Sequence, residues 1–330
     1  MQKRKIGPFE VSAIGLGCMN LSHAYSAPPA PAEAAKILHR ALDLGCTFLD
    51  TAALYGFGAN ETLIGNVLAE RRHEYILASK CGMTGVDRKR VIDGRPETLK
   101  RTCEESLKRL RTNVVDLYYL HRWDKQVPVE DSVGALAELV AAGKIRAIGL
   151  SEVSAATLRR AHGVHPIAAI QTEYSLWTRN PEVAVLDAAS ELGVGFVAFS
   201  PLARGFLAGA LDEGVTFAER DIRRGMPRFL GADFSANLRL LNGFAALAKE
   251  ADCSMAELAL AWLLSRGDHV VPIPGTTQMA NLEANLRAAN ANPGGPILDQ
   301  ADALINAATV RGPRYNAATQ AEIDTEEIPA

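Results

Sequence analysis

The chain has 330 residues, of which 48% are hydrophobic and 22% are charged. This length and composition allow a full hydrophobic core, either in one large α/β barrel or in two smaller domains. The formal net charge of -3 leaves no broad basic face, which argues against nucleic acid or an anionic membrane as the main partner.

The amino terminus has no apolar stretch long enough for a signal peptide, and no later window is long enough to span a membrane. We therefore expect a cytoplasmic protein. The 5 cysteines are scattered and form no C-x-x-C pair, which favours free thiols in a reducing compartment. Neither a disulfide nor a metal site is predicted.

Short apolar runs alternate with amphipathic stretches along the chain, which is typical of strands followed by helices. A small hairpin is expected first, over residues 4–11 around Gly7-Pro8. Strands are then predicted at eight places, over residues 13–17, 46–50, 75–79, 114–121, 145–150, 168–172, 194–199 and 269–273.

Capping signals support the helices independently of the apolar pattern. Pro31 lies in the first turn of a helix that runs to Gly45, and Ser254 with Glu257 forms a capping box before an apolar helix. Eight strands with helical partners predict a (β/α)₈ TIM barrel with an N-terminal β-hairpin, as one domain over residues 1–330. A doubly wound open sheet is the alternative. The polar tail over residues 312–330 is expected to be partly mobile.

The glycine pattern separates these two folds. A dinucleotide-binding doubly wound sheet should carry G-x-G-x-x-G after its first strand. Here Gly15-Leu16-Gly17 continues as Cys18-Met19-Asn20, so the third glycine is absent. Two long segments that follow strands, residues 83–95 and 211–234, are rich in Gly, Asp and Arg, as loops over an active-site mouth often are.

Four polar residues are placed to meet at one mouth of such a barrel. Asp50, Lys80 and His121 each close a predicted strand, and Tyr55 follows the first of these strands. A phenol has a pKa of about 10, so a nearby cation is needed to favour the phenolate. Lys80 supplies that cation and Asp50 is its natural counter-ion. We predict that Tyr55 donates a proton to a carbonyl oxygen that His121 orients.

Each of these residues also has an ordinary explanation. An aspartate at a strand end commonly caps a loop, a lysine there is often solvated, and a lone histidine is more often structural than catalytic. Taken together at barrel strand ends, the four indicate a catalytic group.

The residues from Gly45 to Gly56, followed by Asn60-Glu61, match the aspartate-threonine-alanine-x-x-tyrosine signature of the aldo-keto reductases. The chain resembles that family from residue 11 to about residue 290, because further matches follow in the family's order and spacing at Lys80, His121, Gly149-Leu150-Ser151, Gln171 and Ser200-Pro201-Leu202. The stretches Ser151-Glu152-Val153 and 173–177 are closer to the bacterial, fungal and plant branch related to pyridoxal reductases and auxin-induced proteins.

The resemblance implies an NADPH-dependent oxidoreductase that reduces an aldehyde or ketone to an alcohol by hydride transfer, with Tyr55 as the general acid and with NADH also open. It implies a nicotinamide site with three kinds of contact. Cys18, Met19 and Asp50 would lie beside the nicotinamide, Phe199 would stack on it, and the carboxamide would be bound by Ser151, Glu152 and Gln171. An ionised Glu152 can only accept from the carboxamide.

The same resemblance places the remainder of the cofactor after the last two strands. The pyrophosphate would lie against Ser200, Leu202 and Arg204, although a loop salt bridge is the alternative for Arg204. The adenosine end would lie against Gly275, Thr276, Thr277, Gln278, Glu283 and Asn285. Many members place a lysine or arginine near Gln278 to pair with the 2′-phosphate, and here that position is neutral.

Aromatic residues near the predicted mouth suggest a pocket for planar or apolar carbonyl compounds. The residues expected to line it are Asn20, Phe57, Trp123, Trp177 and Phe229. The alternative is that several of them simply cover the rim of the barrel. The oligomeric state stays open.

Two other functions are alternatives. A cofactor-binding regulatory subunit, like the β-subunits of potassium channels in this family, would favour a partner-binding extension or a large apolar patch, and the termini show neither. A lyase or aldolase with Lys80 as a Schiff-base amine would need an unpaired Lys80 of lowered pKa.

Overall fold

The computed structural model describes residues 1–25, 27–86 and 89–328. Its main sheet has eight parallel strands whose order along the sheet follows the chain. These strands are β3 (Leu16–Gly17), β4 (Phe48–Asp50), β5 (Ile76–Cys81), β8 (Val115–Leu120), β9 (Ile145–Ser151), β10 (Ile167–Glu173), β11 (Gly195–Phe199) and β12 (Val270–Pro272).

The first and last strand segments meet and close the sheet. The amide of Gly15 donates to the carbonyl of Pro272 at 3.0 Å, and the amide of Gly17 donates to that of Pro274 at 3.2 Å. A Cβ atom on Gly17 would lie 2.7 Å from the carbonyl oxygen of Ile273, so only glycine allows this approach. The prediction of a (β/α)₈ barrel is therefore confirmed.

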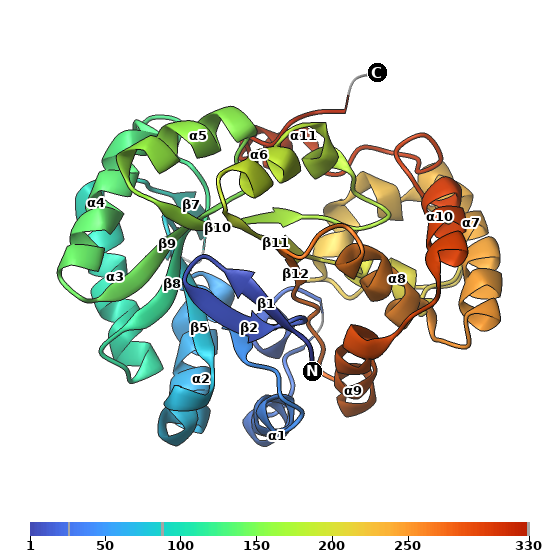
Figure 1. The fold of residues 1–330 in the computed structure, drawn as a ribbon, viewed down its shortest axis with the longest axis horizontal. Coiled ribbons are helices and arrows are strands. Elements are labelled where there is room, and N and C mark those ends of the chain that lie inside the picture. The colour runs from blue at the N-terminus through green and yellow to red at the C-terminus, as the bar shows by residue number, and fades with distance from the viewer. Residues whose placement is uncertain (26, 87–88, 329–330) are drawn as a thin grey trace.

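Helices surround this sheet (Figure 1). Those along the barrel are α1 (Pro31–Asp43), α2 (Ala59–Leu68), α3 (Pro96–Leu110), α4 (Val129–Ala141), α5 (Ala155–Val164), α6 (Val185–Glu191), α7 (Gly231–Glu250), α8 (Met255–Leu264), which follows α7, and α9 (Met279–Arg287). Two more lie near the carboxyl terminus, α10 (Gly295–Leu304) and α11 (Ala317–Ala321). The expected capping box of Ser254 and Glu257 begins α8. No helix of the described residues has both the length and the apolarity needed to cross a membrane.

The N-terminal hairpin closes one end of the barrel. Strands β1 (Lys3–Ile6) and β2 (Phe9–Ser12) pair antiparallel, as predicted, and lie across the barrel in front of the sheet (Figure 1). Ile6, Phe9 and Val11 join the interior cluster with side chains such as Phe48. These apolar side chains fill the end of the barrel where the strands begin. A functional site is therefore expected at the opposite end, where the strands finish.

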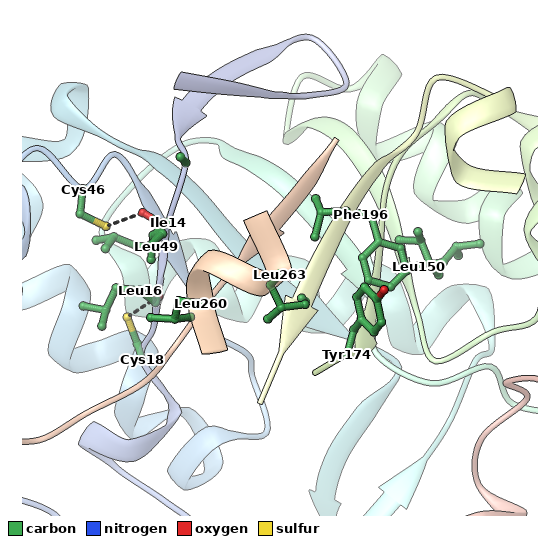
Figure 2. Packing of buried hydrophobic residues seen from close by; sticks show 14 of the residues in the cluster. Ile14, Leu16, Cys18, Cys46, Leu49, Leu150, Tyr174, Phe196, Leu260 and Leu263 are labelled. Carbon is green, nitrogen blue, oxygen red and sulfur yellow. Dashed lines mark hydrogen bonds between the residues drawn. The ribbon is translucent and has the colours of Figure 1, made fainter. Parts of the chain in front are cut away.

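A second apolar layer lies between the sheet and the helices. Figure 2 shows it from β3 and β4 across to α8 and β11, with Leu16, Leu49, Leu260 and Phe196 among its members. The predicted segment 83–95 forms a further hairpin of β6 (Met83–Val86) and β7 (Lys89–Ile92), whose connecting residues 87–88 lie outside the described ones.

The polar tail packs against the barrel over its described part. The ammonium of Lys125 donates to the carbonyls of Ala321 and Ile323 at 3.0 and 2.9 Å. The carboxylate of Asp324 accepts from the hydroxyls of Ser154 and Thr157 at 3.0 and 2.7 Å. These bonds anchor the tail as far as Asp324, and residues 329–330 lie outside the described ones.

Candidate active site

The structure brings the four predicted polar residues together where β4, β5 and β8 end. Asp50 is the last residue of β4, Lys80 lies in β5 and His121 follows β8. Tyr55 begins a 3₁₀ turn after β4. Lys80 Nζ forms an ion pair with Asp50 and lies 3.3 Å from the hydroxyl of Tyr55. The rings of Tyr55 and His121 meet edge to face, with 5.8 Å between their centroids.

Lys80 is held as a cation by this arrangement. Its side chain is 0% exposed, and burial by itself would lower its pKa, but Asp50 and Tyr55 outweigh burial and raise that pKa. The second carboxylate oxygen of Asp50 accepts from Gln171 Nε2 at 2.7 Å. Because a Schiff-base amine needs an unpaired lysine of lowered pKa, this geometry contradicts the lyase hypothesis for Lys80.

The phenol of Tyr55 keeps its proton at neutral pH. Burial raises the pKa of Tyr55, and the charge of Lys80 opposes only part of that increase. The cation alone would lower the pKa of Tyr55, as expected from the sequence, but burial outweighs it. The charge of Lys80 therefore does not ionise the phenol in the resting protein, although it would stabilise a phenolate formed there.

His121 is neutral in this environment. Burial, followed by the charges of Lys80 and Arg122, places the pKa of its imidazole well below the ordinary value. Its Nδ1 atom is buried and has no hydrogen-bond partner among the described residues. A neutral imidazole can share a hydrogen bond with a substrate oxygen without adding another positive charge beside Lys80.

The neutral state of His121 predicts a loss of stability in mild acid. The unfolded imidazole takes up a proton near a pKa of about 6.5, whereas the folded protein keeps it neutral to lower pH. Since the unfolded state then binds more protons, the free energy of unfolding should fall below about pH 6.5, by at most about 1.4 kcal/mol per pH unit for this residue. Urea unfolding of the wild type and His121→Asn across this range measures the effect. Equal pH slopes in the two proteins would contradict it.

The loop that carries Tyr55 is fixed by buried polar groups within the same motif. Asn60 accepts from the hydroxyl of Thr51 at 2.6 Å, and its amide donates to the carbonyl of Cys18 at 2.8 Å. Glu61 accepts from Ser79 at 2.5 Å and from Arg109 at 2.7 Å. Asn60 and Glu61 are both 0% exposed, so these bonds join the ends of β3, β4 and β5 beneath the tyrosine.

A cavity of about 790 Å³ opens above these residues. Its size is in the range of small-molecule and cofactor sites. Lys80 does not itself line the cavity, but it contacts Tyr55, which does. The predicted residues that line it are Met19, Asn20, Asp50, Tyr55, His121, Ser151, Gln171, Phe199, Ser200, Leu202, Arg204, Gly275, Thr276, Thr277, Gln278 and Asn285.

A buried charge network lies beside this cavity. Arg314 donates to both carboxylate oxygens of Glu152 at 2.8 and 2.7 Å, and Arg204 donates to Glu173 at 2.7 Å. The hydroxyl of Tyr315 lies 3.2 Å from the same oxygen of Glu173. Burial would raise the pKa of Glu173, but Arg204 and Arg314 outweigh it and lower that pKa to about 2. The network joins the tail to the ends of β9, β10 and β11. Arg204 forms the loop salt bridge that was its alternative role, and it also lines the cavity.

Three predicted cofactor contacts lie elsewhere and are corrected. Cys18 is 0% exposed, and its thiol donates to the carbonyl of Leu16 within the apolar layer of Figure 2. Glu152 belongs to the charge network. Glu283 lies on the surface, where it accepts from Arg40 at 2.9 and 2.7 Å. In each case the side chain bonds to another residue and does not line the cavity. Sequence spacing does not show which of these contacts forms.

The predicted aromatic wall is also corrected, because none of its four rings lines the cavity among the described residues. Phe57 is 50% exposed on the outer surface. The ring nitrogen of Trp123 donates to the carbonyl of Val127 at 2.9 Å. Trp177 and Phe229 stack on each other, with 5.7 Å between their centroids, as part of the apolar core. Burial of apolar area placed Trp177 and Phe229 in the core instead of the pocket.

Other cavity residues were missed. Arg122 directly follows His121, and its place just after a predicted strand is a signal that could have found it. Met83, Arg90 and Arg223 belong to the segments 83–95 and 211–234, which the sequence predicts to lie over the mouth. Other lining residues come from loops and from the tail, where no local pattern marks them: His23, Tyr25, Leu54, Tyr315, Asn316 and Thr319.

Known proteins resemble this chain over nearly its whole length. A model of the aldo/keto reductase family matches residues 13–293. A probable aldo-keto reductase 1 of Glycine max is 43% identical over 295 residues, which are 87% of this chain and 84% of that protein. The aldo-keto reductase yakc of Schizosaccharomyces pombe, whose name specifies NADP(+), is 40% identical over 338 aligned positions that cover 99% of this chain and 98% of that protein.

Solved structures show the same fold. The glycerol dehydrogenase AKR11B4 from Gluconobacter oxydans superposes with a TM-score of 0.85 at 29% identity, over 94% of this chain and 97% of that one. The holo form of the aldo-keto reductase AKR11C1 from Bacillus halodurans gives a TM-score of 0.77 at 29% identity, over 94% and 98% of the two chains.

Proposed function

The chain belongs to the aldo/keto reductase family, and on that premise we propose that its cavity receives a small aldehyde or ketone whose carbonyl oxygen takes a proton from Tyr55. The protein is an oxidoreductase, as its family relatives are. The relative from Schizosaccharomyces pombe is named for NADP(+), and NADPH is the cofactor of the reaction.

The observation that carries the proposal is the distance of 3.3 Å between Lys80 Nζ and the hydroxyl of Tyr55. When bound, NADPH supplies the hydride that the carbonyl carbon needs. Tyr55 donates its proton to the carbonyl oxygen, and Lys80 stabilises the phenolate that remains. Asp50 keeps Lys80 charged, and neutral His121 holds the substrate oxygen in line with the phenol.

The residues of the cavity fit this cofactor in their chemistry. Phe199 offers a ring, and Ser151 and Gln171 offer polar groups for a carboxamide, all three in the wall of the same cavity as Tyr55. The loops after β11 and β12 give backbone and hydroxyl donors at Ser200 and Thr276 for phosphate oxygens. Met19 and Asn20 complete the wall beside the first strand.

The proposal is tested by the loss of NADPH absorbance with a panel of aldehydes and ketones. We expect turnover that saturates with both NADPH and the carbonyl compound. Tight NADPH binding without any oxidation at saturating substrate would reject the reductase and support a cofactor-binding regulatory subunit instead.

Gln278 predicts that NADPH binding can be improved by one substitution. Gln278 lines the cavity at the start of α9, and its neutral side chain gives a 2′-phosphate no cationic partner there. Gln278→Arg should strengthen NADPH binding by about tenfold or more, because a charge-assisted hydrogen bond contributes about 1.5–3 kcal/mol. NADH, which lacks that phosphate, should bind as before. Fluorescence titration with both cofactors measures the change, and an equal gain for NADH would contradict the assignment.

A further inference from the structure

Arg122 differs from the other arginines in the described wall of the cavity. The other three each pair with a carboxylate: Arg90 with Glu322, Arg204 with Glu173 and Arg223 with Asp221. Arg122 has no acidic partner among the described residues. Partial burial of a guanidinium without an anion raises the free energy of the folded protein. The position of Arg122 beside His121 therefore suggests that a ligand supplies the anion.

The contacts of Arg122 hold the side chain in place and leave one nitrogen free. Nη1 donates to the carbonyl of His121 at 2.8 Å and lies 3.3 Å from the hydroxyl of Ser151. Nε is enclosed without a partner. Nη2 donates to no described residue and is not enclosed, so it can donate to a ligand in the cavity. The guanidinium is therefore positioned before any ligand arrives.

Neither the carboxylate of the cavity wall nor the proposed phosphate sites of the cofactor pair with Arg122, which leaves the substrate as the source of an anion. Asp50 is the one carboxylate among the described residues of the wall, and Lys80 and Gln171 already occupy its two oxygens. The loops that we propose for the phosphates of the cofactor follow β11 and β12, and β9 and β10 separate β8 from β11 in the sheet. Arg122 stands instead beside His121, where the carbonyl group would lie. Arg90, on the hairpin of β6 and β7, also lines the cavity, but its charge is paired with Glu322.

We propose that Arg122 binds a carboxylate of the substrate, so that the preferred substrates are aldehydes or ketones that carry a carboxylate close to the carbonyl group. This inference rests on the proposed function, since it places the reacting carbonyl at Tyr55. A charge-assisted hydrogen bond from Nη2 fixes the anionic end of the substrate while the carbonyl oxygen lies between Tyr55 and His121.

Matched substrates test the proposal directly. The probes are 2-, 3- and 4-formylbenzoate with their methyl esters, which all keep the aldehyde. The isomers vary the distance of the charge from the aldehyde, and the esters replace the charge by a neutral group that is larger by one methyl. For at least one isomer, the wild type should have the higher kcat/KM for the acid, and Arg122→Met should reduce that preference about tenfold to a hundredfold. Arg122→Lys should retain part of it. Arg159→Met, on the outer surface of α5, is the matched control and should retain all of it.

Ionic strength gives a test that needs no variant. The KM of the wild type for the preferred acid should rise with added salt, and that for its ester should stay constant, because salt screens the charge interaction. If all three acids and their esters react equally well, the anion site is rejected while the reductase stands. If Arg122→Met weakens NADPH binding and leaves the acid preference unchanged, Arg122 acts on the cofactor through Ser151, and the proposal is also rejected.

Calorimetry separates this proposal from the proposed function. Each acid and ester is titrated into the protein saturated with NADP(+), where no reduction takes place. Binding of an acid that is stronger than that of its ester and is lost in Arg122→Met supports the anion site, even if none of the six compounds is turned over. Binding that Arg122→Met does not change rejects it.

Discussion

Replacing Tyr55 by phenylalanine is expected to lower kcat by about 10²- to 10⁴-fold, because the variant has no group to donate a proton to the carbonyl oxygen. The ion pair of Lys80 and Asp50 lies below the ring and does not depend on the hydroxyl, so the fold of the site should persist. NADPH binding, followed by fluorescence, should stay close to that of the wild type. Single-turnover measurements would place the loss in the chemical step.

Tyr118→Phe is a matched control for this substitution. Tyr118 is also buried in a strand, but it lies outside the cavity wall among the described residues. Its removal should leave kcat unchanged. A rate for Tyr55→Phe near that of the wild type would show that another group donates the proton, and the role assigned to Tyr55 would be withdrawn.

Arg314→Met is expected to produce the largest loss of stability. The substitution leaves the carboxylate of Glu152, whose side chain is 0% exposed, without its cation. Breaking a buried ion pair by removing one partner typically costs about 3–5 kcal/mol. Glu173 keeps Arg204, so the loss should come mainly from Glu152 and from the tail that Arg314 anchors. Equilibrium urea unfolding measures it.

Two further variants separate the buried network from a general loss of charge. Arg160→Met removes a guanidinium from a solvent-exposed pair with Glu130 and should change the unfolding midpoint little. Combining Arg314→Met with Glu152→Met should recover part of the stability, because no isolated carboxylate remains buried. If the single Arg314 variant unfolds like the Arg160 variant, the network does not hold the tail.

Much of the fold could be predicted because its signals are local. The alternation of apolar runs and helical stripes and the capping box at Ser254 depend on residues near one another in the chain. The ends of predicted strands also sufficed to bring Asp50, Tyr55, Lys80 and His121 together, since parallel strands in a barrel finish at the same mouth.

The sequence by itself determined the barrel, the group of polar residues at its mouth and the family. Only the tertiary structure decided which side chains face the cavity, because that choice depends on partners far along the chain. Glu152 turns to Arg314, which is 162 residues away, and the predicted aromatic wall is buried or displaced. The direction of the pKa shift of Tyr55 also depends on tertiary structure. Burial raises this pKa and the charge of Lys80 lowers it, and only the packed structure creates the burial.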